Sequence, residues 1–224
     1  MSHRIACVIP AFDAARRLPM VLAATRAAAP AATLIVVDDG SRDDTGAIAH
    51  QLADVTVSWP DNRGKGAALR AGFREALALD ARAVVTLDAD GQHDPQFVAP
   101  LLGALVEADI VVGARARANG TMPWARRVTN ALSSAAFTAI SGTTLPDTQC
   151  GFRAIRACVL RAVEGRGDGY EYESDLLLRA LASGFRVKSV PVSTVYGPAS
   201  HFRAWADGTR IVRTLWAHRG GTRA

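Results

Sequence analysis

Two aspartates stand one residue apart where an apolar run ends. Asp88 and Asp90 follow the run AVVTL, with Ala89 between them and Gln92 two residues further on. Carboxylates at this spacing can face one small volume if the backbone turns there. This suits a hard divalent cation such as Mg2+ or Mn2+, to which Gln92 can add a carbonyl oxygen. The pair alone is a weak signal, because aspartate often begins turns, so its place in the fold decides its meaning.

Polar residues also follow three other apolar runs. The first run leads into residues 10–13 (PAFD), the second into residues 38–41 (DDGS), and a later one ends at Arg115. Ligands of an open parallel sheet bind outside the carboxyl ends of its strands. If these runs are parallel strands, their terminal residues meet Asp88 and Asp90 at one rim.

Lys65 stands between two glycines ahead of a predicted helix, in NRGKGAALRAGF. Free backbone N–H groups at a helix start, together with one lysine, can bind an anionic group. The segment is not a P-loop, because the spacing GxxxxGK[ST] is absent. A glycine-rich turn before a surface helix is the alternative interpretation.

The elements that would position these residues alternate, as far as residue 115, between short β-branched runs and alanine-rich stretches. This βαβ pattern, with near-continuous apolar strands, predicts an α/β fold with a mostly parallel open sheet and helices on both faces. Beyond residue 115 come helices and one strand, RVKSVPV, in which Pro191 indicates a sheet edge or strand end. The predicted helices cover residues 18–29, 45–53, 66–79, 95–107, 124–141 and 173–183.

Length and composition favour one domain. The chain has 224 residues, 49% of them hydrophobic, which is enough for one substantial core. We expect a single domain over residues 1–224, with a first half at 1–115, a second at 116–200 and a basic segment at 201–224. No apolar run reaches the roughly 18 residues of a membrane-spanning helix, and the N-terminal run is too short for a secretory signal. Three cysteines without CxxC spacing suit a reducing cytosol.

The net charge of +5 comes almost wholly from arginine. Such a surface attracts anions such as nucleotides, lipid phosphates or an acidic membrane face, and it equally describes an ordinary soluble surface. Residues 201–218 can form a basic amphipathic helix, which would lie on an anionic membrane or pack on its own domain.

Six segments occur in the order and spacing seen in family-2 glycosyltransferases of the GT-A fold. They are VIPAFDAARRLP, IVVDDGSRDDT, NRGKGAALRAGF, TLDADGQHDP, IVVGAR and DTQCGFRAI. The ordered combination is more specific than any one motif. The chain resembles in particular the branch of dolichyl-phosphate mannosyltransferase and related polyprenyl-phosphate sugar transferases. This resemblance implies a GT-A fold and an inverting, metal-dependent transferase that uses a UDP- or GDP-sugar, with residues 1–115 as the nucleotide-sugar-binding half and 116–200 as the acceptor side.

The resemblance implies a nucleotide site at the end of the first two strands. The segment that cradles the nucleotide matches Pro10, Ala11, Phe12 and Asp13. Phe12 lacks the tyrosine hydroxyl usual in the family, and Asp13 stands where asparagine is common. Asp39 matches the carboxylate that contacts the base or the ribose.

The resemblance also implies a diphosphate site. The DxDxQ pattern would hold Mg2+ or Mn2+, and two basic positions lie near the donor. The matching residues are Lys65, Asp88, Ala89, Asp90, Gln92 and Arg115. Asp90 and Arg115 are assigned catalytic roles, because the metal and a guanidinium stabilise charge that grows on the leaving diphosphate.

On the acceptor side, residues 147–152 match a family loop in which Asp147 and Gln149 are candidate contacts. Arg127 lies on the polar face of the predicted helix 124–141. Together with the basic tail, it favours a lipid-phosphate or lipid-linked acceptor, while a hydroxyl acceptor stays open.

Three further residues have two interpretations each. Glu173 is a candidate catalytic base if the acceptor is a hydroxyl; a phosphate is already ionised, and acids at a helix start are usually dipole partners. Many GT-A enzymes close a C-terminal segment over the donor, so His201 and Arg203 are candidate donor contacts, and His201 a candidate metal ligand. A surface histidine is the alternative.

Two other functions fit part of the sequence. A nucleotidyltransferase would carry a glycine-rich loop near the first strand, which VIPAFDAARR lacks. A non-catalytic nucleotide-sugar-binding module is disfavoured by the intact aspartate pair. We therefore expect a cytoplasmic glycosyltransferase with peripheral contact to an anionic membrane and no nucleic-acid partner.

Overall fold

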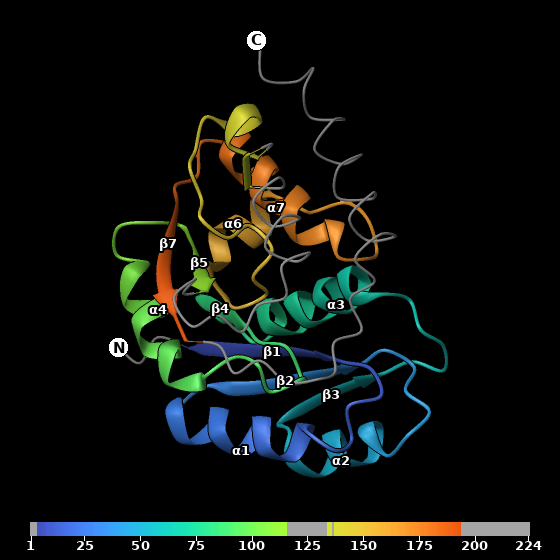
Figure 1. The fold of residues 1–224 in the computed structure, drawn as a ribbon. Coiled ribbons are helices and arrows are strands. Elements are labelled where there is room, and N and C mark those ends of the chain that lie inside the picture. Colours follow the sequence, from blue (N-terminus) through green and yellow to red (C-terminus); the bar gives the residue numbers. More distant parts are fainter. Residues whose placement is uncertain (1–3, 116–133, 136, 194–224) are drawn as a thin grey trace.

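The sheet has seven strands in the order β3-β2-β1-β4-β6-β5-β7 (Figure 1). This is seen in a computed structural model that describes residues 4–115, 134–135 and 137–193. The strands are β1 (Ile5–Ala11), β2 (Thr33–Asp38), β3 (Val55–Ser58), β4 (Ala83–Thr86), β5 (Ile110–Arg115), β6 (Arg153–Arg156) and β7 (Val187–Val192). Strand β6 runs antiparallel to its neighbours β4 and β5, and all other pairs are parallel. The mostly parallel α/β sheet predicted from the apolar runs is confirmed, and the antiparallel β6 makes it a mixed sheet.

Helices cover both faces of the sheet. Figure 1 shows α1 (Leu18–Ala28) and α2 (Thr45–Leu52) on one face of the strands β1 to β3, and α3 (Lys65–Ala78) on the other. Cys7, Val8 and Ile9 in β1 are all completely buried. A strand covered on both faces must be apolar at successive positions, which explains why these runs do not alternate with polar residues.

Helix α3 approaches β1 closely at Gly72. A Cβ atom on Gly72 would lie 2.3 Å from Cγ1 of Val8, so a larger residue would force the helix away from the sheet. The neighbouring Leu69 and Phe73 of this helix are also buried. This packing fixes the first turn of α3, with Lys65, beside the carboxyl ends of the strands.

The remaining elements complete both faces. A 3-10 turn η1 (Pro95–Phe97) leads into α4 (Val98–Ala104), which contacts β5, β6 and β7. Helices α6 (Ala157–Ala162) and α7 (Glu171–Ala182) lie on the side of α3 (Figure 1), and α7 contacts α3 directly. One hydrophobic cluster joins residues from both predicted halves of the chain.

Most predicted elements are confirmed. The helices predicted at 18–29, 45–53, 66–79 and 173–183 agree with α1, α2, α3 and α7 to within two residues at each end. The helix predicted at 95–107 is wrong at both ends, since it begins as a 3-10 turn and stops at Ala104. The helix predicted at 124–141 lies mostly outside the described residues, although 134–135 and 137–141 are helical.

Two strands in the second half of the chain can also be compared with the prediction. Strand β7 lies at the sheet edge, as Pro191 indicates. The sequence prediction missed β6, which is only four residues long and inserts between β4 and β5. In the described ranges, no helix combines the length and the hydropathy needed to cross a bilayer.

Candidate active site

The loops after β1 and β2 are joined by Asp13. Its backbone N–H donates to Ser41 Oγ (2.9 Å), and its Oδ1 accepts from the backbone N–H of Arg42 (2.8 Å). Asp13 has a positive φ of 47°, a conformation that aspartate tolerates better than most residues. Pro10 and Ala11 end β1 next to β2, and the half-buried Phe12 follows them. The predicted nucleotide segment therefore lies at the carboxyl edge of the sheet.

Asp39 holds the loop that precedes α3. Its two carboxylate oxygens accept the backbone N–H groups of Arg63 (2.6 Å) and Gly64 (2.9 Å). Burial raises the pKa of this carboxyl above its ordinary value, although the two N–H groups oppose that rise. Asp39 lies in the predicted nucleotide region, and its contacts in this structure are with the protein backbone.

The first turn of α3 differs from the prediction. One of the two interpretations left its N–H groups free for an anion, but those of Gly66 (2.7 Å) and Ala67 (3.4 Å) donate to the carbonyl oxygen of Asp168. A Cβ on Gly66 would lie 2.9 Å from the carbonyl carbon of Asp168, so glycine allows this close approach. The loop before α7 thus caps α3, and these two N–H groups are bonded within the protein.

Lys65 forms ion pairs with two carboxylates that come from distant parts of the chain. Its Nζ lies 2.7 Å from Asp88 Oδ1 and 3.0 Å from Glu173 Oε2, and 5.4 Å from the centre of the Tyr170 ring. Burial alone would raise the pKa of Asp88, but the charge of Lys65 outweighs it and holds that pKa at about 2. Asp88 is therefore ionised and already neutralised by a protein cation.

His93 supports the backbone of Asp88. The N–H of Asp88 donates to His93 Nδ1 (3.1 Å), and the imidazole ring stacks on Phe152 with 5.1 Å between ring centres. Burial lowers the pKa of His93, which favours the neutral ring that such an acceptor requires. Sequence reasoning gave His93 no role, although it stands in the same DxDGQH segment.

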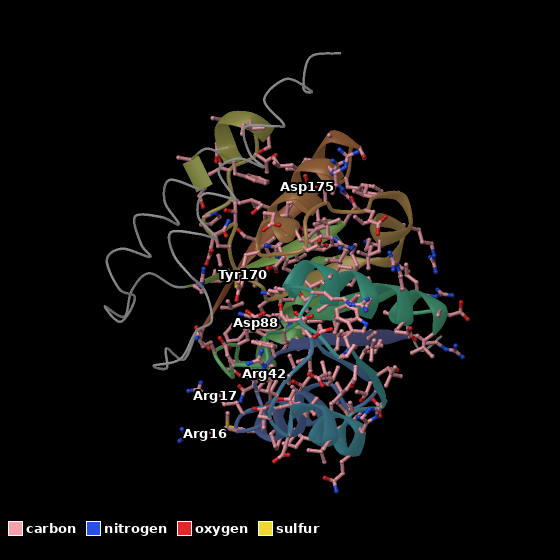
Figure 2. The ribbon with its side chains drawn as sticks, turned by 90° about the vertical axis from the view of Figure 1, so that its right-hand side faces the viewer. Arg16, Arg17, Arg42, Asp88, Tyr170 and Asp175 are labelled. Carbon is pink, nitrogen blue, oxygen red and sulfur yellow. The ribbon has the colours of Figure 1, made fainter. Side chains whose placement is uncertain are left out.

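Asp90 and Gln92 complete the turn. Asp90 Oδ1 accepts the backbone N–H of Gln92 (2.9 Å), and the carbonyl oxygen of Asp90 accepts from Arg17 Nη1 (2.5 Å). Burial, and then the negative charge of Asp88, raise the pKa of Asp90. Figure 2 shows the labelled Arg16, Arg17 and Arg42 in the N-terminal part of the molecule, on the same side as Asp88.

A divalent cation fits this pair of carboxylates. The charge of Asp88 disfavours ionisation of Asp90, and a cation between them would relieve that repulsion. The described part of the chain holds no preformed group of three His, Cys, Asp or Glu side chains for a metal. The residues present therefore suit an ion that takes its other ligands from phosphate oxygens and water, as Mg2+ commonly does.

Arg115 and Asp147 were predicted on opposite sides of the site, and the structure brings them together. Arg115 Nε lies 2.6 Å from Asp147 Oδ2, and its Nη2 lies 3.0 Å from Oδ1, so the pair is bidentate. Asp147 is buried and also accepts the backbone N–H of Gln149 (3.2 Å). Gln149 in turn donates through Nε2 to Ser174 Oγ (3.2 Å). The two acceptor-side candidates thus position Arg115 and the start of α7.

Sequence reasoning missed Arg153 and Gly151. Arg153 is buried; it donates to the carbonyl oxygens of Cys150, Thr148 and Glu173, and its Nε lies 3.6 Å from Glu173 Oε1. A Cβ on Gly151 would lie within 2.8 to 2.9 Å of Lys65 Nζ and both carboxylate oxygens of Asp88. An arginine inside the apolar run GFRAI was the available signal for a buried charge.

Some predicted residues fall elsewhere. Arg127, His201 and Arg203 lie outside the described residues, as does the basic segment 201–218.

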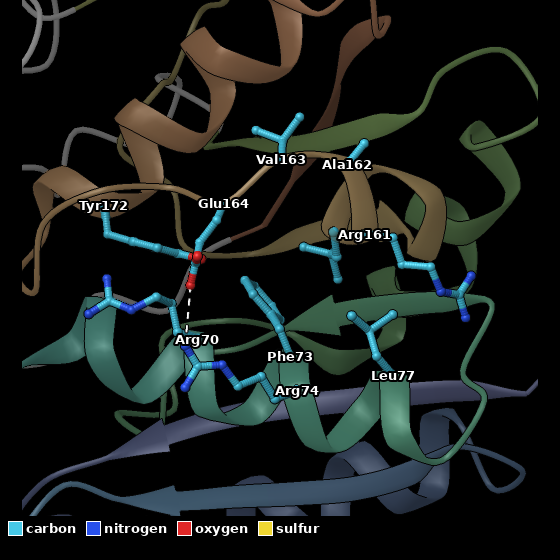
Figure 3. Close-up of a pocket in the computed structure, with 10 residues that line it drawn as sticks. Arg70, Phe73, Arg74, Leu77, Arg161, Ala162, Val163, Glu164 and Tyr172 are labelled. Atoms are coloured by element: carbon cyan, nitrogen blue, oxygen red, sulfur yellow. Dashed lines mark hydrogen bonds and ion pairs between the residues drawn. The ribbon is translucent and has the colours of Figure 1, made fainter.

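A hollow of about 320 Å3 lies between α3 and the segment after α6 (Figure 3). Its lining includes Arg70, Arg74 and Tyr172, and none of the predicted site residues contributes to it.

Comparisons with known proteins agree on the family and the fold. Residues 6–163 match the family model described as glycosyl transferase family 2. The chain is 33% identical to polyprenol monophosphomannose synthase of Mycolicibacterium smegmatis, over 86% of this chain and 77% of that one. It is 34% identical to undecaprenyl-phosphate mannosyltransferase of Micrococcus luteus, over 86% of this chain and 84% of that one.

Solved structures of glucosyl-3-phosphoglycerate synthase from Mycobacterium tuberculosis have a similar fold. The complex with phosphoglyceric acid has a TM-score of 0.79 at 22% identity, covering 98% of this chain and 81% of that one. The complex with Mn2+, UDP and phosphoglyceric acid has a TM-score of 0.78 at 22% identity, covering 98% and 79%. At this identity the likeness concerns the fold, and it confirms the GT-A architecture.

Proposed function

Because this chain belongs to glycosyltransferase family 2, we propose that it transfers a sugar from a UDP- or GDP-sugar to a polyprenyl phosphate, with Mg2+ or Mn2+ at the donor diphosphate. The observation that carries the proposal is the position of Asp88 and Asp90 at the carboxyl edge of the sheet, in one charged cluster with Lys65 and Arg115. The acceptor is supported by two relatives, each more than 30% identical, that are named for sugar transfer to polyprenol or undecaprenyl phosphate.

In the proposed reaction an acceptor phosphate oxygen attacks the anomeric carbon, and the bond from that carbon to the diphosphate oxygen breaks with its electron pair. Asp88, Asp90 and Gln92 would hold the cation, which would neutralise the charge growing on the leaving group. Arg115 adds a guanidinium whose planar donors suit phosphate oxygens. Lys65 adds a second protein cation in the same cluster.

The nucleotide would lie over the ends of β1 and β2. The loop with Pro10, Ala11, Phe12 and Asp13 is tied to the loop after β2, and Asp39 is tied to the loop before α3. These bonds fix the shape of a cradle before the donor arrives, which lowers the conformational entropy lost on binding.

The role of Glu173 depends on the acceptor. A phosphate acceptor is ionised at pH 7 and needs no general base. Glu173 is buried between Lys65 and Arg153, at 3.0 Å and 3.6 Å, which suits a residue that positions a cation. With a hydroxyl acceptor, the catalytic-base assignment of Glu173 would apply instead.

Contact with an anionic membrane is part of the proposal, since the acceptor is a lipid. The basic segment 201–218 is the candidate contact. Attraction of arginines to anionic lipids is screened within about 8 to 10 Å at physiological salt, whereas apolar docking is not. Binding to anionic vesicles, absent with neutral vesicles and lost at high salt or after truncation at Ser200, would support it. An intact chain that ignores anionic vesicles would contradict it.

The test of the proposed function is a transfer assay with defined components. Undecaprenyl phosphate in detergent micelles is incubated with each of several UDP- and GDP-sugars, with Mn2+, with Mg2+, or with EDTA. We expect a sugar-lipid phosphate product from at least one donor with metal, and none with EDTA. Transfer to a dephosphorylated polyprenol but not to the phosphate would contradict the acceptor. Equal product with EDTA would contradict the metal.

A further inference from the structure

Lys65 is shared between the proposed metal site and a carboxylate behind it. Its ammonium lies 2.7 Å from Asp88 Oδ1 and 3.0 Å from Glu173 Oε2, and its side chain is 14% exposed. Gly151 packs against both members of the Lys65–Asp88 pair, where a Cβ would come within 2.8 Å of the ammonium. In this structure the cation that neutralises Asp88 is therefore a protein side chain in a nearly closed space.

A divalent cation on Asp88 would compete with this ammonium. Carboxylate oxygens bind Mg2+ or Ca2+ at about 2.0 to 2.6 Å. An ion on Asp88, whose side chain is 29% exposed, would leave two cations within a few Å of each other if Lys65 did not move, and water would screen them only in part. The repulsion between two like charges at this distance favours the departure of one of them from the carboxylate.

Glu173 already pairs with the ammonium and can keep it when Asp88 binds an ion. Its backbone belongs to α7 and its carbonyl oxygen accepts from Arg153 Nη1 (2.7 Å), while Arg153 is itself fixed by two further carbonyl oxygens. The backbone of Glu173 is thus held in place, and its carboxylate lies between Lys65 and Arg153. Lys65, by contrast, has a flexible four-carbon chain and three rotatable donors. A small rotation about its side-chain bonds would shift its ammonium from Asp88 toward Glu173.

We propose that Lys65 is an exchangeable counter-cation of the metal site: it neutralises Asp88 before the divalent ion binds, and when the ion arrives it keeps its pair with Glu173 and turns from Asp88 to the donor diphosphate. The inference rests on the metal and donor of the proposed function. It implies that Lys65 weakens ion binding to the protein alone. A bound diphosphate would form an ion pair with the displaced ammonium. The ion and the nucleoside diphosphate should therefore strengthen each other's binding.

The test measures Mn2+ binding, not turnover. Free Mn2+ is titrated by electron paramagnetic resonance, and UDP and GDP affinities are measured by calorimetry with and without Mn2+, since coupling between two ligands must be reciprocal. The variants are Lys65→Met, Glu173→Gln and their combination. Lys188→Met is the matched control, because Lys188 is exposed on β7 and pairs with Glu107 in the turn before β5.

The variants should move in opposite directions. Without nucleotide, Lys65→Met should bind Mn2+ more tightly, by about 5- to 150-fold, the usual range of coupling between sites. Glu173→Gln should bind it more weakly, because the ammonium loses its second partner. In the Lys65→Met background, Glu173→Gln should have no further effect, since the pair acts as one unit. Lys188→Met should behave as the wild type.

Three results would overturn the inference. They are weaker or unchanged Mn2+ binding in Lys65→Met, tighter binding in Glu173→Gln, and Mn2+ binding in the wild type that is independent of UDP and GDP. Circular dichroism shows whether Lys65→Met folds. If it does not, the inference is still tested by Mn2+ binding to Glu173→Gln and by wild-type Mn2+ binding with and without UDP or GDP. The proposed function has its own test, which fails if the wild type forms no sugar-lipid product. Whether Mn2+ and the nucleoside diphosphate strengthen each other's binding is measured independently of that product.

Discussion

The two regions that meet at the active site hold their charged residues in different ways. In the N-terminal region, Asp13 and Asp39 accept backbone N–H groups of neighbouring loops, at 2.6 to 2.9 Å. In the region from Asp147 to Asp175, charged residues pair mainly with other charges, as Asp147 does with Arg115 and Glu173 with Lys65. The first region shapes loops, and the second sets the charge of the site.

This difference has a consequence for stability and activity. A carboxylate that accepts backbone N–H groups keeps its place whether or not a substrate is bound. Breaking a buried ion pair, in contrast, leaves an uncompensated charge, which typically costs about 3 to 5 kcal/mol. Substitutions in the second region should therefore affect the diphosphate site strongly, even though those residues come late in the chain and need not touch the nucleotide.

Removal of Asp90 should cause the largest loss of sugar transfer among the substitutions that test this comparison. Asp90→Ala removes a proposed metal ligand at the end of the N-terminal region, and transfer should fall below detection while the melting temperature stays close to that of the wild type. Asp80→Asn, in the exposed turn after α3, is the matched control and should keep full activity. Full metal-dependent transfer by Asp90→Ala would remove this residue from the site.

Arg115 tests whether a pair between the two regions serves the chemistry or only the fold. Arg115→Ala should lower kcat by about 100-fold or more, as expected for a lost donor to a developing anion. It should also destabilise the protein, because Asp147 would remain buried without its bidentate partner.

The double variant separates the two effects. Adding Asp147→Asn to Arg115→Ala removes the uncompensated charge, so denaturant unfolding should show recovered stability while kcat stays low. If kcat recovers together with stability, Arg115 is a structural ion-pair partner and its catalytic assignment is wrong.

Substitutions of two glycines, one in each region, should separate an effect on activity from an effect on stability. Gly151→Ala places a methyl group within 2.9 Å of Lys65 Nζ and Asp88, so it should reduce transfer by about 100-fold through displacement of the charged pair. Gly72→Ala crowds Val8 in the N-terminal core and should cost about 1 to 3 kcal/mol of stability with a smaller loss of kcat.

A third glycine provides the control. Gly103 in α4 has no atom within 4 Å of an added Cβ, so Gly103→Ala should keep activity and stabilise the helix slightly. Equal kinetic effects in Gly151→Ala and Gly103→Ala would show that space beside the charged pair does not matter.

The smallest expected effect is the pH dependence of the Lys65–Asp88 pair. The pKa of Asp88 falls from its ordinary 3.8 to about 2 in the folded protein. A lowered carboxyl pKa adds stability that is complete above pH 3.8 and is lost as the pH falls through 2, here about 2 kcal/mol. Urea unfolding at pH 5, 4, 3 and 2 should show this loss in the wild type, and Asp88→Asn should lack that part of it. If the free energy of unfolding changes with pH in the same way in both proteins, the stabilising role of the Lys65–Asp88 pair is contradicted.

The sequence alone determined the N-terminal half of the fold. Residues 5–115 carry apolar strands and amphipathic helices whose periodicity depends on local composition, so β1 to β5 and α1 to α3 follow from it. The aspartate pair after β4 and the arginine at the end of β5 were likewise located by sequence, because parallel strands place their carboxyl ends at one edge.

Tertiary structure decided which charges meet. The insertion of β6 between β4 and β5 brings Gly151 and Arg153 to Asp88 and Glu173, and the loop before α7 caps α3 through Asp168. Lys65 and Glu173 are more than a hundred positions apart in the sequence. No local pattern records such a pairing, because it depends on strand order and helix packing and not on the spacing of neighbouring residues.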